Sequence, residues 1–600
     1  MPQNNKAKTI SKRVIKKSLV LTKKALSKSK KAKRAGYLVR NVLFSGDPTP
    51  NVYHIARYAP TIPEYLKQLK ESESLTLKPL ISIVMPTYNT PIPYLKECIE
   101  SVLIQSYSNW ELCIADDASS SKEVVKTIKD YMTSDKRIKL VERKDNGHIS
   151  AATNSAINIA GGEFIALLDH DDVLWPNALY EVVSVINRQP EVDLIYTDED
   201  KIDSEGKTHS YPFFKPDWSP EFLESCNYIT HFSTMRKSLI AEIGGLRVGY
   251  EGAQDWDLLL RLTEKTSNIV HVSKVLYSWR IHEDSTAMDT DAKPYVYEAQ
   301  NKLLKDHIER LGEKALVKQG VIKQHSSVEY AVNGNPHITI IIVSTNRGTF
   351  RKCVTTIMKH LSYSNVEVIL VPNSKKEHDF SEHVTRAKSN FSLIRTKDKL
   401  QPSRYNAAVE QAKGEYLLFV EDSLLVSTPN WVNLLLGDAQ RSGVGVVGGK
   451  VLNRTKQHFL RAGDATGIYG LYAPLLEGMP VEDVHYMRGL YGQSRRNVSV
   501  LDGCFMLTKQ VFMEVGGFDT HIDDMFVADL CLKILEKGLR NIYNPFVCSY
   551  DLTNKTAGDA DMRRDKDAIK LFQKRWREYI EYDPYLNQNF TRTNAQLEVK

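Results

Sequence analysis

An internal repeat is the feature that most constrains the fold of this 600-residue chain. Residues 79–89 and 336–346 are each an apolar, β-branched run that ends in small polar residues, the pattern of a buried parallel strand that enters a loop. Further matches follow at nearly constant spacing, including Tyr-Ser-Asn at 107 and 363, Gly-Glu-aromatic at 162 and 414, and Gly-Gly at 244 and 516. The chain is therefore a tandem duplication.

Strand-like and helix-like segments alternate within each copy. In the first copy, residues 111–115 and 164–168 are strand-like, while 94–103 and 149–159 have the apolar spacing of amphipathic helices. This alternation predicts an α/β fold with a doubly wound, mostly parallel sheet in each copy. Ligands of such sheets bind beyond the carboxyl ends of the strands, so functional residues should lie in the loops that follow them.

The repeat divides the chain into six segments. We expect a basic amphipathic tail over 1–45, a helical lead-in over 46–78, the first repeat over 79–290, a helix and linker over 291–335, the second repeat over 336–560, and a C-terminal helix and tail over 561–600. The connecting segment should contain a helix over 294–312 and an extended linker over 318–336, and the chain should end with an amphipathic helix over 565–579.

Cysteine usage and hydropathy exclude several classes of protein. The seven cysteines are scattered, without a Cys-x-x-Cys pair, which indicates reduced core residues instead of a zinc or redox site. No run reaches the roughly 18 to 20 apolar residues that span a bilayer, and the basic N-terminus lacks the apolar core of a secretory signal. We therefore expect a cytoplasmic protein.

The net charge of +7 comes from the N-terminal tail, because residues 1–40 contain 14 Lys or Arg and no acidic residue, which leaves 66 basic against 73 acidic residues elsewhere. Apolar residues such as Ile10, Val14 and Leu21 recur at roughly helical spacing among the lysines. We expect this tail to bind an anionic membrane surface, on the inner face of the plasma membrane. A solvated tail and attraction to RNA are the alternatives, and no nucleic-acid partner is expected.

Four polar clusters accompany the predicted strands and helices of the first copy. They are Asp116-Asp117, Asp169-His170-Asp171-Asp172, Gln254-Asp255-Trp256-Asp257, and residues 279–285, which include Arg280 and His282. An Asp-x-Asp pair at a strand end can hold Mg²⁺ or Mn²⁺ together with substrate phosphates. Alone it would more often be an ordinary acidic loop, but four clusters in this order favour a diphosphate and metal site around Asp169, His170 and Asp171.

Together these motifs resemble the family-2 glycosyltransferases of the GT-A fold, especially the rhamnosyltransferase-like enzymes of bacterial surface polysaccharide synthesis. The resemblance covers residues 79–286, and the second copy is its degenerate counterpart. The matching residues are Pro-Thr-Tyr-Asn at 86–89, Asp-Asp-Ala-Ser at 116–119, Asn-Gly at 146–147, Asn154, Asp-His-Asp-Asp at 169–172, residues 252–257, and His282. The chain departs from the family pattern at Thr153, where arginine is common, so a phosphate contact there is unsupported.

The resemblance implies an inverting hexosyl- or deoxyhexosyltransferase that uses a UDP- or dTDP-sugar, a glycan or lipid-linked acceptor, and Mn²⁺ or Mg²⁺. It implies donor binding by Thr87, Tyr88, Asn89, Asp117, Asn154, Asp169, His170 and Arg280, with Asp117 on the nucleobase and Arg280 on the diphosphate. Asp171 and His282 would ligate the cation, although His282 could instead satisfy a core hydrogen bond.

The resemblance also implies that Asp255 is the general base, with helix capping as its alternative and as the preferred interpretation of Asp257. Trp256 could stack on an acceptor sugar, but packing is the better interpretation. Acidic residues Asp198, Glu199 and Asp200 follow a strand-like run and could touch donor sugar or acceptor, or form a solvated loop.

The second copy has lost the residues on which this chemistry depends. Asp117, Asp171, Asp255 and His282 correspond to Asn373, Ser423, Val527 and Asn554. Valine cannot accept a proton and serine is a poor ligand for a hard cation, although Glu421 and Asp422 keep some acidity. We expect the second copy to position an acceptor glycan or to contact the first.

Two alternative functions remain, a bifunctional glycan polymerase with two active sites and a nucleic-acid-associated binding protein with a vestigial nucleotide pocket. The four losses disfavour the polymerase. A Gly-x-Gly-x-x-Gly sequence at 443–448 lies in a strand-like run instead of opening a helix, so we interpret it as coincidental.

Overall fold

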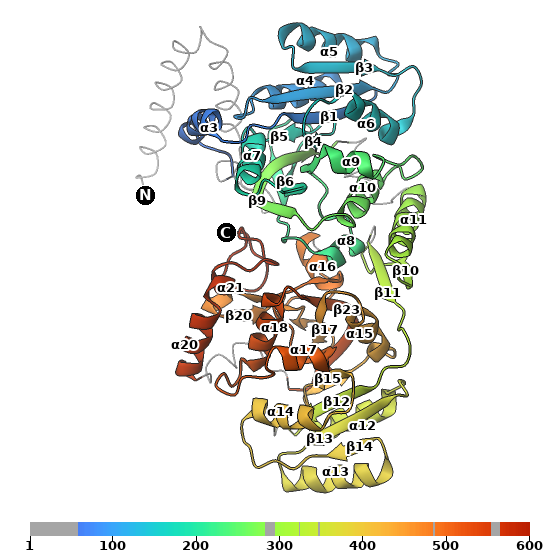
Figure 1. Cartoon of the computed structure of the whole chain (residues 1–600), viewed down its shortest axis with the longest axis vertical. Helices are drawn as coiled ribbons and strands as arrows, with labels where there is room; N and C mark the ends of the chain where they lie inside the picture. Colours follow the sequence, from blue (N-terminus) through green and yellow to red (C-terminus); the bar gives the residue numbers. More distant parts are fainter. Residues whose placement is uncertain (1–57, 283–293, 323–324, 346–347, 484–485, 554–564) are drawn as a thin grey trace, which may run out of the picture. The chain divides into compact units, whose positions relative to one another are not determined.

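The computed structural model describes residues 58–282, 294–322, 325–345, 348–483, 486–553 and 565–600 (Figure 1). The predicted membrane-binding tail at 1–40 and the predicted counterpart of His282, Asn554, lie outside these residues. The chain forms two compact units: the first contains residues 1–213 and 229–291, and the second contains 214–228 and 292–600.

The first unit is built on a nine-stranded sheet with the order β3-β2-β1-β4-β8-β6-β9-β5, in which β7 pairs with β6. The strands are β1 (Ile81–Thr87), β2 (Trp110–Asp116), β3 (Ile138–Glu142), β4 (Phe164–Leu167), β5 (Val173–Leu174), β6 (Leu194–Ile202), β7 (His209–Phe213), β8 (Ser233–Arg236) and β9 (Ile269–Arg280). Strands β3, β2, β1 and β4 run parallel, as expected, whereas β8 runs antiparallel to both β4 and β6.

Helices follow the strands of the first unit as the alternation predicts. They are α3 (Ile62–Ser74), α4 (Ile92–Leu103), α5 (Lys122–Ser134), α6 (His148–Ile159), α7 (Ala178–Arg188), α9 (Lys237–Glu242) and α10 (Gln254–Thr263). In α4 the side chains of Leu95, Cys98, Ile99 and Val102 are buried, which places one apolar stripe of the helix on the core. Helix α6 packs on β1 and β2.

The second unit repeats this topology, with strand order β14-β13-β12-β15-β22-β17-β23-β16. The strands are β12 (Ile338–Val343), β13 (Val366–Val371), β14 (Phe391–Leu393), β15 (Tyr416–Val420), β16 (Leu424–Val426), β17 (Val444–Leu452), β18 (Phe459–Arg461), β21 (Arg496–Asn497), β22 (Cys504–Thr508) and β23 (Arg540–Asp551). Ile338 pairs with Tyr416 in the register in which Ile81 pairs with Phe164. The duplication is therefore structural, and the glycine motif at 443–448 lies at the start of β17.

The helices of the second unit are α11 (Pro294–Arg310), α12 (Phe350–His360), α13 (Lys375–Ala387), α14 (Gln401–Gln411), α15 (Trp431–Ala439), α16 (Tyr486–Gln493), α17 (Lys509–Glu514), α18 (Phe526–Glu536), α20 (Lys566–Arg575) and α21 (Arg577–Glu581). Helix α11 corresponds to the helix predicted over 294–312, and α20 and α21 correspond to the one predicted over 565–579. The expected linker over 318–336 instead contains most of a hairpin of β10 (Ala315–Gln319) and β11 (Ser326–Tyr330).

Two further expectations concern membrane spans and cysteines. Among the described residues, no helix combines the length and the apolar character that a membrane crossing needs. All seven cysteines are free, and all but Cys548 are buried, in agreement with a reduced core role.

One segment of the first repeat belongs to the second unit. Residues 214–228, which we call the tether, leave the first unit after β7 and return to it just before β8. The tether contains the short helix α8 (Pro220–Ser225), which packs on β11 and β21 of the second unit; α8 and β11 are labelled in Figure 1.

Candidate functional site

The polar clusters of the first unit meet at the carboxyl ends of its parallel strands. The amide of Asp117, after β2, donates a 2.9 Å hydrogen bond to the carbonyl of Thr87 at the end of β1, and the Leu168 amide, after β4, bonds Val84 of β1. The thiol of Cys98 on α4 contacts the carbonyl of Asp169. The structure therefore brings the loops at 87–89, 116–119 and 168–172 to one edge, as the strand order requires.

Asp171 and His282 form a close pair at this edge. His282 Nε2 lies 2.8 Å from Asp171 Oδ2, and their side chains keep 13% and 17% of their accessible surface. Neighbouring ligands of an octahedral ion with bonds of about 2.1 Å are about 3 Å apart, so the spacing suits two ligands of one cation. Both residues were predicted as metal ligands from the sequence, and the structure places them together.

A second cluster surrounds His231, which the sequence motifs do not include. His231 Nε2 lies 3.5 Å from Asp169 Oδ2 and His231 Nδ1 lies 3.6 Å from Glu199 Oε2. The imidazole stacks on Tyr277 with ring centroids 4.7 Å apart. Burial would lower the pKa of His231, but hydrogen bonds and charge from Asp169 and Glu199 raise it well above its usual value.

Asp172 and Arg280 hold the Asp-His-Asp-Asp loop in place. Asp172 is buried and accepts hydrogen bonds from Tyr277 Oη at 2.5 Å and from the Arg280 amide at 2.7 Å. Burial raises the pKa of Asp172 well above its usual value, and the charges of Asp171 and Asp169 raise it further. Its ligand atom lies within 4.8 Å of those of Asp169 and His231, and each of its two oxygens accepts one internal hydrogen bond.

The Arg280 side chain does not support the predicted contact with a diphosphate. Its guanidinium is buried and donates to the Asp171 carbonyl and to Glu97, each at 2.7 Å, and to the Asp203 carbonyl at 3.2 Å. Arg280 therefore fixes the backbone of a predicted metal ligand instead of facing substrate.

The donor types at this edge suit a divalent cation. Asp171 and His282 offer a carboxylate oxygen and an imidazole nitrogen 2.8 Å apart, and Asp169, Asp172 and His231 have ligand atoms within 4.8 Å of one another, donors compatible with Mn²⁺ and, for the oxygens, with Mg²⁺. The ring of His170 adjoins them, and its buried Nδ1 makes no hydrogen bond among the described residues. This nitrogen lies 3.6 Å from Asp171 Oδ1, so His170 adjoins a predicted metal ligand.

The predicted nucleotide loop is ordered by hydrogen bonds within the protein. The Asn89 side-chain oxygen accepts from the amides of Ser120 and Ser121, at 2.9 and 3.3 Å, and the Thr87 hydroxyl bonds Thr90 at 2.6 Å. The Tyr88 ring remains 48% exposed. Tyr88 is thus the side chain of this loop that can present an aromatic face to a base.

The buried carboxylate of Asp117 is surrounded by hydrogen-bond donors of the protein. Its carboxylate pairs with Arg143 at 2.6 Å and accepts from the Gly147 amide at 3.0 Å, while Asn146 bonds the Asp117 carbonyl at 3.1 Å. Arg143 was not predicted as a site residue. The Asn-Gly match at 146–147 therefore shapes the pocket of Asp117, and a carboxylate can still accept further hydrogen bonds in this arrangement.

Asn154 has a structural role in both copies. Its amide nitrogen donates to the Leu246 carbonyl at 2.8 Å and its oxygen accepts from the Leu246 amide at 3.0 Å. Asn406 makes the same pair of bonds with Phe518. Because both polar atoms are engaged with the Gly-Gly loop, the predicted donor contact of Asn154 has no geometric support.

The acidic run at 198–200 lies inside β6, so the solvated loop that the sequence allowed is wrong. Asp198 and Asp200 are fully buried and pair with His271 and His209, at 2.8 and 2.7 Å, within the fold. Glu199 contacts the His231 cluster. Trp256 is 2% exposed, which supports packing and opposes sugar stacking.

Asp255 lies in the first turn of α10, where the helix begins after Ala253 without a side-chain cap. Burial raises the pKa of Asp255 above its usual value of 3.8, although the charge of His231 opposes the rise. Capping is the role that the sequence favours for Asp257, but the structure does not support it. The buried carboxylate of Asp257 pairs with Arg247 and with Arg261. Asp255 and Asp257 therefore differ in role despite their spacing.

Within the described part of the second unit, the residues of this site are replaced. Strand register equates Asp172, Glu199, His231 and Tyr277 with Leu424, Val451, Gly503 and Ser549. Ser423, in the place of Asp171, donates a 2.7 Å hydrogen bond to Asp551. Asp422 is buried and accepts from the Thr345 hydroxyl at 2.7 Å. Asp422 is thus engaged in bonds within the protein.

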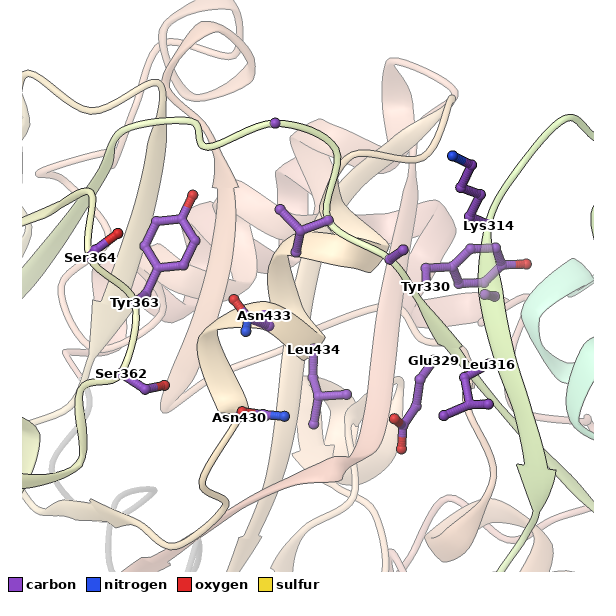
Figure 2. A pocket seen from close by; sticks show the side chains of 14 residues that line it. Lys314, Leu316, Glu329, Tyr330, Ser362, Tyr363, Ser364, Asn430, Asn433 and Leu434 are labelled. Carbon is purple, nitrogen blue, oxygen red and sulfur yellow. The ribbon is translucent and has the colours of Figure 1, made fainter.

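A hollow of about 670 Å³ lies on the second unit (Figure 2). Residues Ser362, Ser364, Asn430 and Asn433 line it with polar side chains, and Leu316 and Leu434 provide apolar surface. Ser362 and Ser364 immediately precede β13, so the hollow is next to the amino end of that strand. It is therefore not the remnant of a donor site, which would lie at the carboxyl ends.

Comparison with known proteins identifies relatives of both repeats. The model of the family "Glycosyl transferase family 2" matches residues 82–244 and 339–512, which together make up more than half of the chain. Protein y4gI of Sinorhizobium fredii is 39% identical over 533 residues, 85% of this chain and 57% of that protein. The O-antigen biosynthesis protein RfbC of Myxococcus xanthus is 33% identical, over 86% of this chain and 41% of that protein.

This chain thus spans about half the length of these relatives. Among solved structures, S. aureus TarS 1-349 in complex with UDP-GlcNAc is 20% identical with a TM-score of 0.32, over 38% of this chain and 66% of that one. The family match falls on both structural repeats and includes the loops that carry Thr87, Asp117 and Asp171. The chain therefore belongs to glycosyl transferase family 2.

Proposed function

We propose that the first unit transfers a sugar, with inversion, from a nucleoside-diphosphate sugar to a hydroxyl group of an acceptor. The observation that carries this proposal is the Asp171–His282 pair beside Asp169, at the sheet edge where the exposed Tyr88 also lies. Support also comes from the second unit, in which Ser423 replaces Asp171 although the surrounding fold is kept.

Asp171 and His282 would hold Mn²⁺ or Mg²⁺, with Asp169 near the ion or the ribose. When bound, the cation neutralises the charge that develops on the departing nucleoside diphosphate. Arg280 and Asp172 contribute indirectly, because they fix the backbone on which Asp171 is carried. Arg280 is thus a positioning residue in this proposal, not a ligand of the diphosphate.

Asp255 would act as the general base. Its carboxylate accepts the proton of the acceptor hydroxyl while that oxygen bonds the anomeric carbon and the bond to the nucleoside diphosphate breaks, in a single displacement. The burial that raises the pKa of Asp255 makes it a stronger base than an exposed aspartate. The loss of this residue to Val527 in the second unit accords with one reaction centre per chain.

The donor would place its base near Tyr88 and Asp117, with the pocket of Asp117 shaped by Arg143 and Gly147. We propose a UDP- or dTDP-sugar as donor and a glycan or lipid-linked acceptor of bacterial surface polysaccharide synthesis. The relative RfbC is named an O-antigen biosynthesis protein, which supports this class of acceptor. Peripheral binding to the inner face of the plasma membrane through residues 1–40 is part of the proposal.

The test is a donor panel in which nucleotide release is measured with Mn²⁺ and then with EDTA. Release should require one donor and the metal, and it should be lost in Asp171→Ala and in Asp255→Asn. Transfer that survives chelation, or an active Asp171→Ala variant, contradicts the proposed metal role. Salt-dependent RNA binding without turnover of any donor would favour the nucleic-acid alternative.

A further inference from the structure

We propose that the second unit positions the active site of the first by holding the tether, residues 214–228. The inference rests on the proposed function, because it concerns Asp169 and Glu199 of that site. It gives the second unit a role in transfer that does not require a reaction centre or a bound glycan there.

Both ends of the tether lead to Glu199. Phe213, the last residue before the tether, is the strand partner of Glu199 across β6 and β7. At the other end, the Thr230 hydroxyl donates to Glu199 Oε2 at 2.7 Å and the His231 amide donates to the same oxygen at 3.1 Å. His231 in turn lies 3.5 Å from Asp169. The tether is therefore a chain excursion that opens and closes on the candidate site.

A buried ionic cluster holds the middle of the tether in the second unit. Glu224 is 2% exposed and pairs with Arg441 at 2.6 Å and closely with Arg495. Glu221, also buried, pairs with Arg441 and Arg540, each at 3.1 Å. Burial would raise the pKa of Glu224, but the charges of Arg441 and Arg495 hold it far below its usual value. The carboxylate is thus ionised and fixed at physiological pH.

Neutral contacts fix the tether on both sides of this cluster. Ser219 Oγ donates to Asn497 Oδ1 at 2.6 Å and accepts from the Asn497 amide at 3.0 Å. Asn587 Nδ2 donates to the Lys215 carbonyl at 2.8 Å, and Tyr582 Oη donates to Asp217 at 2.7 Å. The tether is therefore held along its length and not at a single point.

The stretch of chain between Glu224, which the second unit holds, and His231 of the candidate site is only six residues long. Of the intervening residues 225–230, only Asn227 and Thr230 are partly exposed, and the others are buried. Because Glu224 and His231 are joined by only these six residues of chain, a change in how the tether is held should displace Thr230 and His231. Glu224 and its arginine partners are, on this account, positioning residues for Asp169 and Glu199.

The experiment uses the full chain and compares Glu224→Gln with Asp529→Asn. Asp529 is an equally buried carboxylate of the second unit, and it pairs with Arg575, Lys533 and Trp576, all of which lie outside the tether. Mn²⁺ binding is measured by electron paramagnetic resonance, kcat and KM by nucleotide release, and folding by circular dichroism. Ser219→Ala is a milder tether variant that keeps all charges.

Glu224→Gln should weaken Mn²⁺ binding and lower kcat by about tenfold to a hundredfold, the range seen when residues supporting metal ligands are changed. Ser219→Ala should act in the same direction with a smaller effect, and it serves as the deciding variant if Glu224→Gln does not fold. Asp529→Asn should lower the unfolding temperature but leave Mn²⁺ affinity and kcat near wild type.

Wild-type affinity and kcat in both folded tether variants would overturn the inference, as would an equal loss in Asp529→Asn. These outcomes leave the proposed function intact. If instead the wild-type chain neither binds Mn²⁺ nor releases nucleotide from any donor, the proposed function itself fails, and the inference falls with it.

Discussion

His282 Nε2 lies 2.8 Å from Asp171 Oδ2, although the two residues are 111 positions apart in the sequence. β9 runs parallel to β6, pairs antiparallel with β5, and ends just before His282, while the loop after β4 carries Asp171. The sheet topology therefore creates the pair, and Arg280 secures it by bonding the Asp171 carbonyl. In the second unit the same topology carries Ser423 in the place of Asp171, and Ser423 bonds Asp551.

Replacing Asp171 or His282 by alanine should abolish metal-dependent transfer. Each change removes one of the proposed protein ligands, so the cation would no longer offset charge on the leaving group. We expect kcat/KM to fall by at least about a hundredfold for each variant, with native circular dichroism. Nucleotide release over a range of Mn²⁺ concentrations measures the effect, and wild-type kinetics in either variant would refute the assignment.

Asp422→Asn is the matched change in the second unit. Asp422 is buried and bonded to Thr345, so the variant should lower the unfolding temperature. Transfer by the folded protein should stay within about twofold of wild type, the scale of a change away from functional groups. A loss comparable to that of Asp171→Ala would mean that the second unit takes part in chemistry.

Asp255→Asn should lower kcat by about a hundredfold to ten-thousandfold, the usual contribution of a general base, while donor binding is kept. The pH profile gives an independent check. Asp255 works in its deprotonated form and burial raises its pKa above 3.8, so kcat should fall on the acidic side at a pH above that of an ordinary aspartate. An unchanged kcat in the variant would exclude Asp255 as the base.

Sequence reasoning located most of the fold because its signals are local and repeated. The apolar strands, the amphipathic helices and the offsets between copies predict both sheets, and the loops that carry Asp171, Asp255 and His282 follow from them. The sequence alignment of the two copies also indicates that the chain has a single reaction centre, because it places Ser423 at the position of Asp171. The strand register of the structure confirms that placement.

The contacts that sequence reasoning missed depend on side-chain direction and on long-range packing. His231 lies just before β8 and belongs to none of the sequence motifs. The signal that could have identified it is its replacement by Gly503 at the equivalent position of the second copy. Arg280 resembles a phosphate ligand by its position, yet its guanidinium turns into the protein toward Glu97. The tether lies within the first repeat in sequence, so spacing alone could not assign it to the second unit.

Glu224→Gln should destabilise the second unit in a pH-dependent way. Removing a charge from a buried ionic cluster costs about 3 to 5 kcal/mol at neutral pH, because the arginines keep their charge. The pKa of Glu224 is lowered from 4.5 in the folded chain, so its stabilisation is present above about pH 4.5 and declines as the pH falls below that value. Denaturant unfolding of both proteins at pH 7, 5 and 4 measures the difference.

That difference between wild type and Glu224→Gln should be constant from pH 7 to 5 and smaller at pH 4. Asp529→Asn provides the control for a buried carboxylate away from the tether. A difference that grew on acidification would show that Glu224 is not held as an ionised group.

The stoichiometry of Mn²⁺ binding to the full chain, titrated in the presence of UDP and followed by electron paramagnetic resonance, tests the central claim most directly. The account predicts one bound ion per chain, lost in Asp171→Ala and kept in Asp422→Asn. Two bound ions, or one that persists in Asp171→Ala, would contradict a single reaction centre built on Asp171 and His282.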